Sequence, residues 1–143
     1  MTLIVDAGPL LALADRSDPQ HAAVERTLRQ EPGRLVLSAF CAAEADYLIA
    51  RDFGSKAQRT FLQELASGQF EVLALSPDEH LLVVELDDDY PGMGLADLSI
   101  VLLAARYDTR RILTFDERHF RAVVPLQGGA FTLLPVDDTS APG

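Results

Sequence analysis

Short runs of consecutive apolar residues alternate along the chain with longer segments in which apolar residues recur every three or four positions. Unbroken apolar runs are typical of strands buried on both faces of a parallel sheet, and the longer periodic segments are typical of helices. The runs predict strands at residues 2–6, 35–37, 70–75, 112–115 and 131–134. The periodic segments predict helices at residues 7–15, 19–31, 39–53, 55–66, 77–86 and 96–107.

Residues that favour helix starts stand where these helices are expected to begin. Asp18, followed by proline, and Ser38 can each cap a helix, and Ser76 with Glu79 forms a capping box. Residues 87–94 are expected to form a loop. Alternating strands and helices predict an α/β protein, a single-domain α/β/α sandwich with a central parallel sheet. We expect residues 1–136 to form this domain and residues 137–143 to be a disordered tail.

Composition narrows the class of protein. The chain has 143 residues, of which 48% are hydrophobic and 24% charged, as expected for a globular protein. We expect no signal peptide and no membrane span, because no apolar run approaches the length of either. The single cysteine, Cys41, fits a reducing cytoplasm and is expected to be a small core residue. The net charge of −10 argues against a nucleic-acid binder with a broadly basic surface.

Two predicted strands each end in an acidic residue. LIVDAGPLLAL delivers Asp6 after the first strand, and ILTFDERHF delivers Asp116 after the fourth. Sites in open α/β sheets form beyond the carboxyl ends of the strands, where both carboxylates are expected. Each residue alone is also consistent with an ordinary turn.

Two further acids occupy helical positions that favour the same edge. Asp97 shares a helix face with apolar residues three, four and seven positions later, and Glu44 aligns with Phe40, Tyr47 and Leu48. Asp97 alone could serve as a helix cap, and Glu44 could simply pair with an arginine. Together, however, four converging carboxylates would repel one another, so we expect a cation among them.

Oxygen ligands favour Mg²⁺ or Mn²⁺ over zinc, and a hard cation held by carboxylates is suited to phosphodiester hydrolysis. Asp6, Asp97 and Asp116 are expected to hold the ion, with Glu44 as a further ligand or an aid to water deprotonation. His119 is expected to be structural, with a place near the ligands or substrate as the alternative.

These segments resemble a known family. LIVDAGPLLAL, Glu44 in AEADYL, GLADLSIVLLA and ILTFDERHF together are similar to the PIN domain and, more narrowly, to VapC-type toxins of bacterial toxin–antitoxin pairs. The resemblance covers roughly residues 2–135 and places Asp6, Glu44, Asp97 and Asp116 at the family's acidic metal-binding positions. It implies a Mg²⁺- or Mn²⁺-dependent endoribonuclease that cuts tRNA or ribosomal RNA, forms a homodimer and is inhibited by a VapB-type antitoxin.

The chain departs from the family pattern just after the first aspartate. Many members carry threonine or serine there, where this chain has Ala7 and Gly8. Ser99, two residues after Asp97, is a candidate for the missing hydroxyl, with a helix-capping role as the alternative.

Arginines are concentrated around Asp116, and their forked side chains suit phosphate contacts. Arg111, Arg118 and Arg121 are therefore candidate RNA contacts, although a solvated surface paired with nearby acids explains them equally well. A phosphorelay receiver domain is disfavoured because the only lysine, Lys56, lies far from the last strands. The main alternative is a catalytically silent PIN-like module that binds RNA or protein.

Overall fold

The computed structural model describes residues 1–139. Within these residues a five-stranded, all-parallel sheet is flanked by seven helices, which confirms the predicted α/β/α sandwich. The strands are β1 (Thr2–Val5), β2 (Arg34–Ser38), β3 (Glu71–Leu73), β4 (Arg111–Leu113) and β5 (Thr132–Leu134). Each overlaps a predicted apolar run, although only β1 is buried along its whole length and the edge strand β3 is partly exposed.

The helices are α1 (Ala7–Ala14), α2 (His21–Gln30), α3 (Ala39–Phe53), α4 (Ser55–Ala66), α5 (Pro77–Asp89), α6 (Leu95–Arg106) and α7 (Glu117–Ala122). The Ser38 cap and the Ser76–Glu79 capping box are both present. Three expectations were wrong in detail. Helix α2 begins later than predicted, because Asp18 closes a turn onto the Gln20 amide instead of capping the helix. Helix α5 extends through Asp89, into the expected loop, and α7 was not predicted.

The order of the strands creates a natural place for a site. The strand order is β3-β2-β1-β4-β5. From the central strand β1 the chain first adds β2 and β3 on one side, and then adds β4 and β5 on the other side. The backbone amide of Asp6 donates to the Leu113 carbonyl at 2.9 Å, which joins the carboxyl ends of β1 and β4. Ligands in such sheets bind at the point where the winding reverses. Here that point lies between β1 and β4.

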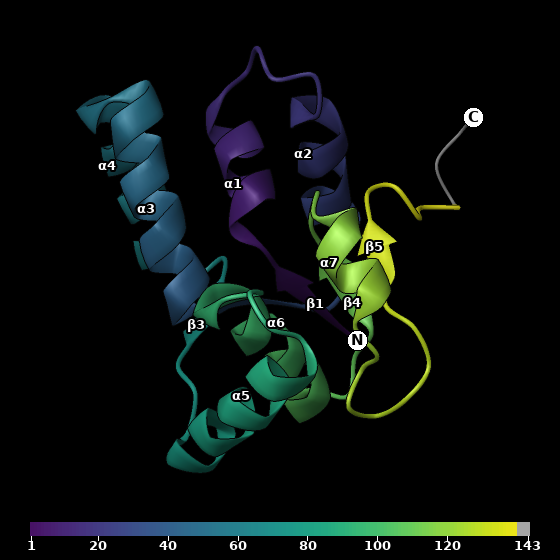
Figure 1. Cartoon of the computed structure of the whole chain (residues 1–143). Coiled ribbons are helices and arrows are strands. Elements are labelled where there is room, and N and C mark those ends of the chain that lie inside the picture. The colour runs from purple at the N-terminus through teal and green to yellow at the C-terminus, as the bar shows by residue number, and fades with distance from the viewer. Residues whose placement is uncertain (140–143) are drawn as a thin grey trace.

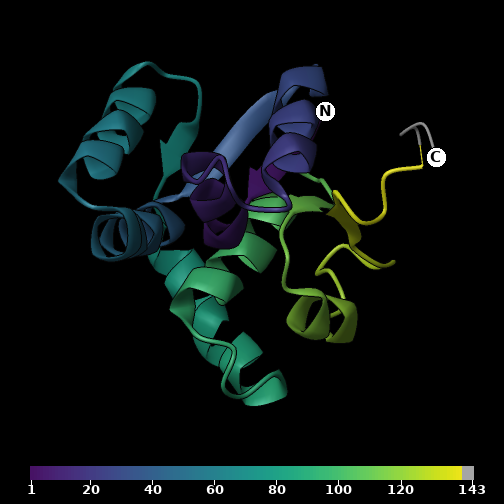
Figure 2. The same ribbon diagram turned by 90° about the horizontal axis from the view of Figure 1, so that it is seen from above.

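Helices pack against the sheet. Helix α6 packs on β1 and β2, and its residues from Leu98 to Ala104 are all buried. Helices α3 and α4 occupy one side of the molecule and α7 with β5 the opposite side (Figure 1, Figure 2). No helix among residues 1–139 is long and apolar enough to cross a membrane.

The expected tail begins with a residue that makes specific contacts. Asp137 accepts hydrogen bonds from the Leu133 amide and from the Arg121 guanidinium. The final residues of the predicted tail, 140–143, lie outside the described part of the chain.

Candidate functional site

Asp6 stands where β1 ends and α1 begins. As the N-cap of α1 it accepts a hydrogen bond from the Ala7 amide at 2.8 Å, and it is buried. Its other oxygen accepts a hydrogen bond from the Thr114 hydroxyl at 2.7 Å. Burial raises the pKa of Asp6, the charge of Asp116 adds to the rise, and the two hydrogen bonds oppose it. The carboxylate is therefore fixed in position and costly to keep ionised.

Thr114 connects the two strand-end acids, a role that the sequence analysis missed. Besides donating to Asp6, its hydroxyl accepts a hydrogen bond from the Asp116 amide at 2.9 Å. The side chain is almost fully buried, so this geometry is held rigidly. Threonine at the end of β4 thus supplies a hydroxyl to the first aspartate, where family resemblance led us to expect one after Asp6. The available signal was the spacing of Thr114 two residues before Asp116.

Ser99 does not supply the hydroxyl that contacts Asp6. Its buried hydroxyl lies 2.6 Å from the Ser38 hydroxyl and 2.6 Å from the Ala96 carbonyl oxygen. These contacts tie the first turn of α6 to the start of α3, so Ser99 has a structural role. Cys41 is likewise buried among core residues, and burial raises the pKa of its thiol to about 12.

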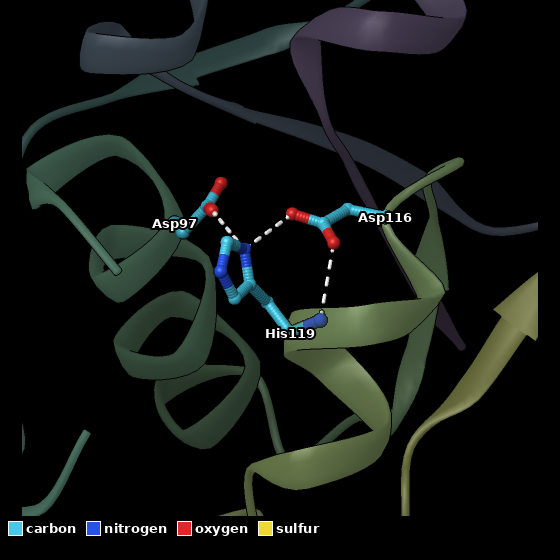
Figure 3. A group of neighbouring side chains, drawn as sticks. All are labelled: Asp97, Asp116 and His119. Carbon is cyan, nitrogen blue, oxygen red and sulfur yellow. Dashed lines mark hydrogen bonds and ion pairs between the residues drawn. The ribbon is translucent and has the colours of Figure 1, made fainter. Parts of the chain in front are cut away.

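Asp116 caps the unpredicted helix α7 and brings a histidine into the site. One carboxylate oxygen of Asp116 accepts a hydrogen bond from the His119 backbone amide at 3.1 Å, and the other lies 2.7 Å from His119 Nδ1. The same ring nitrogen is 3.5 Å from a carboxylate oxygen of Asp97 (Figure 3). His119 therefore lies between two carboxylates, which corresponds to the alternative rather than the structural role first expected for it.

Asp97 projects from the first turn of α6 toward His119 (Figure 3). Its pKa is raised to about 7, mainly by burial and in addition by the charges of Asp6, Asp116 and Glu44, while His119 opposes the rise. Asp97 makes no side-chain cap bond to α6, whose N-cap is Gly94. The simple capping role is therefore wrong. A carboxyl group with so high a pKa among other acids is typical of a functional site.

Glu44 lies at the margin of this group. Its side chain is exposed, yet surrounding protein atoms raise its pKa and the charge of Asp6 raises it further. The predicted face of α3 was inaccurate, because Tyr47 is 65% exposed whereas Cys41, Ala45 and Ile49 are buried. Glu44 therefore projects from the flank of the helix rather than from its core-facing stripe.

Ligand atoms of Asp97, Asp116 and His119 all lie within 4.8 Å of one another, which is compatible with binding one ion. Metal–oxygen bonds of about 2.0–2.6 Å place ligand atoms around one ion at such separations. Asp6 and Glu44 do not belong to this three-residue group, although their charges act on Asp97. The donor set, carboxylates with one imidazole, fits a divalent cation and would relieve the repulsion that raises these pKa values.

The three candidate arginines have different environments. Arg111, at the amino end of β4, donates to Glu31 at 2.5 Å, and Arg121 donates to both carboxylate oxygens of Asp137 at 2.8 and 2.6 Å. Arg118 is exposed, and its side chain has no hydrogen bond or ion pair within residues 1–139. Of the three, only Arg118 has a guanidinium without an acidic partner among residues 1–139.

Comparison with known proteins decides the family. The chain is 40% identical over 135 residues to Ribonuclease VapC26 of Mycobacterium tuberculosis, and the match covers 93% of this chain and 100% of the relative. The chain belongs to the VapC family of PIN-domain proteins. No family model matches it.

Solved structures share the VapC-family fold at low sequence identity. The Mycobacterium tuberculosis toxin VapC20, described as cleaving the sarcin–ricin loop, matches with a TM-score of 0.72 and 18% identity over 80% of this chain and 89% of that one. A toxin–antitoxin complex from Klebsiella pneumoniae has a TM-score of 0.64 and 20% identity, covering 85% and 92%. VapBC2 from Rickettsia felis, bound to a promoter DNA fragment, has a TM-score of 0.65 and 14% identity, covering 93% and 97%.

Proposed function

We propose that this protein is a Mg²⁺- or Mn²⁺-dependent endoribonuclease and the toxin of a toxin–antitoxin pair. The observation that carries the proposal is the group formed by Asp97, Asp116 and His119 at the switch point of the sheet, next to Asp6. The name of the 40% identical relative, Ribonuclease VapC26, supports the same chemistry.

Each acidic side chain has a role in the proposed reaction. Asp97 and Asp116 would hold the ion, with a ring nitrogen of His119 as a third donor. Asp6, held in place by the Thr114 hydroxyl, adds negative charge next to this group and would ligate the ion directly or through water. When bound there, a divalent ion would lower the pKa of a coordinated water and offset the negative charge of the phosphate.

Glu44 is suited to accept the proton of the attacking water. It is exposed at the margin of the group, where water and RNA can reach it. Its raised pKa lies closer to neutrality than that of an ordinary glutamate, which makes it a better base once ionised. All four acids predicted from the sequence, Asp6, Glu44, Asp97 and Asp116, therefore enter the proposed catalytic set.

The proposed partners follow from the same reasoning. We propose tRNA or ribosomal RNA as substrate, a VapB-type antitoxin as inhibitor, a homodimer as the assembly and the cytoplasm as the location. The solved toxin–antitoxin complexes with this fold support an antitoxin partner. Arg118 is the arginine most available to phosphate, whereas Arg111 and Arg121 would first have to leave their acidic partners.

Cleavage of RNA by the purified protein tests the proposal. We expect cleavage with Mg²⁺ or Mn²⁺, none with EDTA, and a loss of at least about 100-fold in the Asp97→Asn variant, since even outer-shell changes cost 10- to 100-fold. Asp78→Asn is the matched control, because it removes the same charge from the first turn of α5, away from the site. RNA binding without cleavage by the wild type would instead favour the silent module.

A further inference from the structure

A hollow lies between α2 and the residues on either side of Asp116 in the chain. It has a volume of about 640 Å³ and lies between the start of α2, the bend after β4 and the residues following β5. Thr114, which holds Asp6, also lines this hollow. The volume lies within the range of small-molecule sites and exceeds that of a single nucleobase. Its walls suggest what kind of ligand would fit.

Phe115 provides an apolar, aromatic wall that is open to solvent. The side chain is 38% exposed, unusually accessible for a phenylalanine next to a buried strand. Gly8 helps to keep it accessible, because a Cβ at that position would stand 3.5 Å from the Phe115 ring and a longer side chain would cover it. Proline and valine at positions 135 and 136 add further apolar surface. Exposed aromatic rings of this kind serve as stacking platforms for unpaired bases.

Arg26 lines the same hollow and has hydrogen-bonding capacity to spare. Its Nε is buried without a hydrogen-bond partner, and no ion pair of its guanidinium is found within residues 1–139. Buried donors without partners are rare, because they forfeit their hydrogen bonds to water. By contrast, Arg29 on the same helix pairs with Glu25 at 2.7 Å. Arg26 is thus a donor group for which the described residues supply no acceptor.

Acidic side chains on the wall distinguish a base from a phosphate. Asp18 and Glu117 both line the hollow, and their charges would disfavour a phosphate group within it. Asp18 uses one oxygen for the Gln20 amide, and Glu117 lies 3.5 Å from Arg121. Each carboxylate has a second oxygen that can accept a hydrogen bond from a ligand. The hollow thus offers an aromatic wall, a forked donor and carboxylate acceptors.

Guanine is the base whose edges match these groups. Its O6 and N7 are adjacent acceptors, which arginine binds through two hydrogen bonds. Its N1–H and N2–H are donors for a carboxylate. Adenine presents N7 as an acceptor next to an amino donor, so the arginine fork would lose one of its two bonds. Pyrimidines have a single ring and would cover less of the Phe115 surface.

We propose that this hollow binds an unstacked guanine of the RNA, with its ring against Phe115 and its O6 and N7 bound by Arg26. The inference rests on the proposed ribonuclease function, which it deepens by assigning base specificity. Phe115 precedes Asp116 directly, so their Cα atoms are about 3.8 Å apart. The bound guanine would therefore belong to a nucleotide beside the phosphate that water attacks at the acidic group.

Sequencing the ends produced from a degenerate RNA pool tests the specificity. The wild type should show guanine at one fixed position next to the cut. In Arg26→Gln and Arg26→Lys the guanine preference should fall by about 10-fold or more, because neither side chain reproduces the fork. Phe115→Ala should raise KM by about 10-fold for all sequences. Arg29→Gln, on the same helix, should behave as wild type.

Binding of mononucleotides separates this inference from the proposed function. In NMR titrations without metal, guanosine monophosphate should shift the amides of Ala23, Phe115 and Val136 more than the other three mononucleotides do. Asp97→Asn should retain these shifts, and Arg26→Gln should lose them while unfolding at a temperature close to that of wild type. Absence of cleavage with these shifts intact would reject only the ribonuclease. Equal shifts with all four mononucleotides, or a guanine preference that survives both Arg26 variants, would overturn the guanine subsite.

Discussion

At the amino ends of the strands acidic side chains near the sheet have arginine partners, whereas around the carboxyl ends of β1 and β4 they face one another. Glu31 accepts from Arg111, and Glu71 lies 3.4 Å from Arg34. At the other end, burial and like charges raise the pKa of Asp6, Glu44 and Asp97 together. The same residue types therefore stabilise one end of the sheet and strain the other, which is expected where acids are retained to bind a ligand.

Two buried threonines allow the ends to be compared directly. Thr109 precedes β4 and donates to the Thr2 carbonyl at 2.6 Å, and its hydroxyl accepts from the Arg111 amide two residues later. Thr114 follows β4 and makes the equivalent pair of bonds to Asp6 and to the Asp116 amide. Only the second threonine positions a carboxylate.

The largest predicted difference between the ends concerns these threonines. Thr114→Val should lower metal-dependent RNA cleavage by about 10- to 100-fold, because Asp6 and Asp116 lose the group that orients them. Thr109→Val should leave kcat/KM close to wild type. Both should lower the free energy of unfolding by about 1–2 kcal/mol, since each loses one buried and one partly buried hydrogen bond. Equal cleavage by the two variants, measured at a temperature where both are folded, would contradict the positioning role of Thr114.

The next largest effect should come from breaking an ion pair at the amino end. The Glu31 side chain is fully buried and that of Arg111 is 28% exposed. Arg111→Ala would leave the carboxylate without its partner and should cost about 2–3 kcal/mol, less than a fully buried pair because of the partial exposure. Arg29→Ala, which breaks an exposed pair with Glu25, should cost at most about 0.5 kcal/mol. Denaturant unfolding measures both, and equal losses would mean that the Glu31 pair is no stronger than a surface pair.

The acidic residues at the carboxyl end of the sheet should make the free energy of unfolding depend on pH. Because the pKa of Asp97 is raised from 3.8 to about 7, the folded state holds more protons than the unfolded state between these values. The free energy of unfolding contributed by this group therefore falls as pH rises from about 4 to about 7. The raised pKa values of Asp6 and Glu44 act in the same direction.

Thermal unfolding without metal at pH 5 and pH 8 isolates the contribution of Asp97. The drop in Tm between these values should be larger in wild type than in Asp97→Asn, by about 4 °C for an effect near 1 kcal/mol. Mg²⁺ or Mn²⁺ at pH 8 should restore stability in wild type, because a ligand of the folded state adds RT ln(1 + [L]/Kd). Identical pH profiles for the two proteins would mean that Asp97 is not strained.

Sequence predicted the acidic edge and the sheet because both follow from local patterns. Continuous apolar runs identify buried strands, and an acid after such a run must lie at the carboxyl edge of a parallel sheet. The sequence analysis missed Thr114, whose contact with Asp6 joins residues 108 positions apart, and it gave a site position for His119 only as the alternative, because that position depends on Asp116 starting α7. That helix has only six residues, four of them charged or histidine, so it lacks apolar periodicity. The order of strands, which makes β1 and β4 neighbours, is likewise a long-range property.

The smallest predicted effect concerns an arginine at the carboxyl end that has no acidic partner among residues 1–139. Arg118 lies two residues after Asp116 and is exposed, so a phosphate can reach it without displacing an ion pair. In the Asp97→Asn background, which keeps RNA intact, Arg118→Ala should weaken RNA binding a few-fold. The plot of log affinity against log salt concentration should also become shallower by about 0.7–1, the share of one phosphate contact.

Arg59 provides the matched control for this measurement. It is also an exposed arginine on a helix surface, but it lies on α4, on the other side of the molecule from α7 (Figure 1). Arg59→Ala removes the same net charge, so any change caused by overall charge alone should appear equally in both variants. A shallower slope in Arg118→Ala only would place RNA at the carboxyl end of the sheet, beside the acids. Equal slopes would mean that Arg118 is an ordinary solvated side chain without a phosphate contact. Phosphate binding would then have to involve arginines that pair with acids in this structure, such as Arg121.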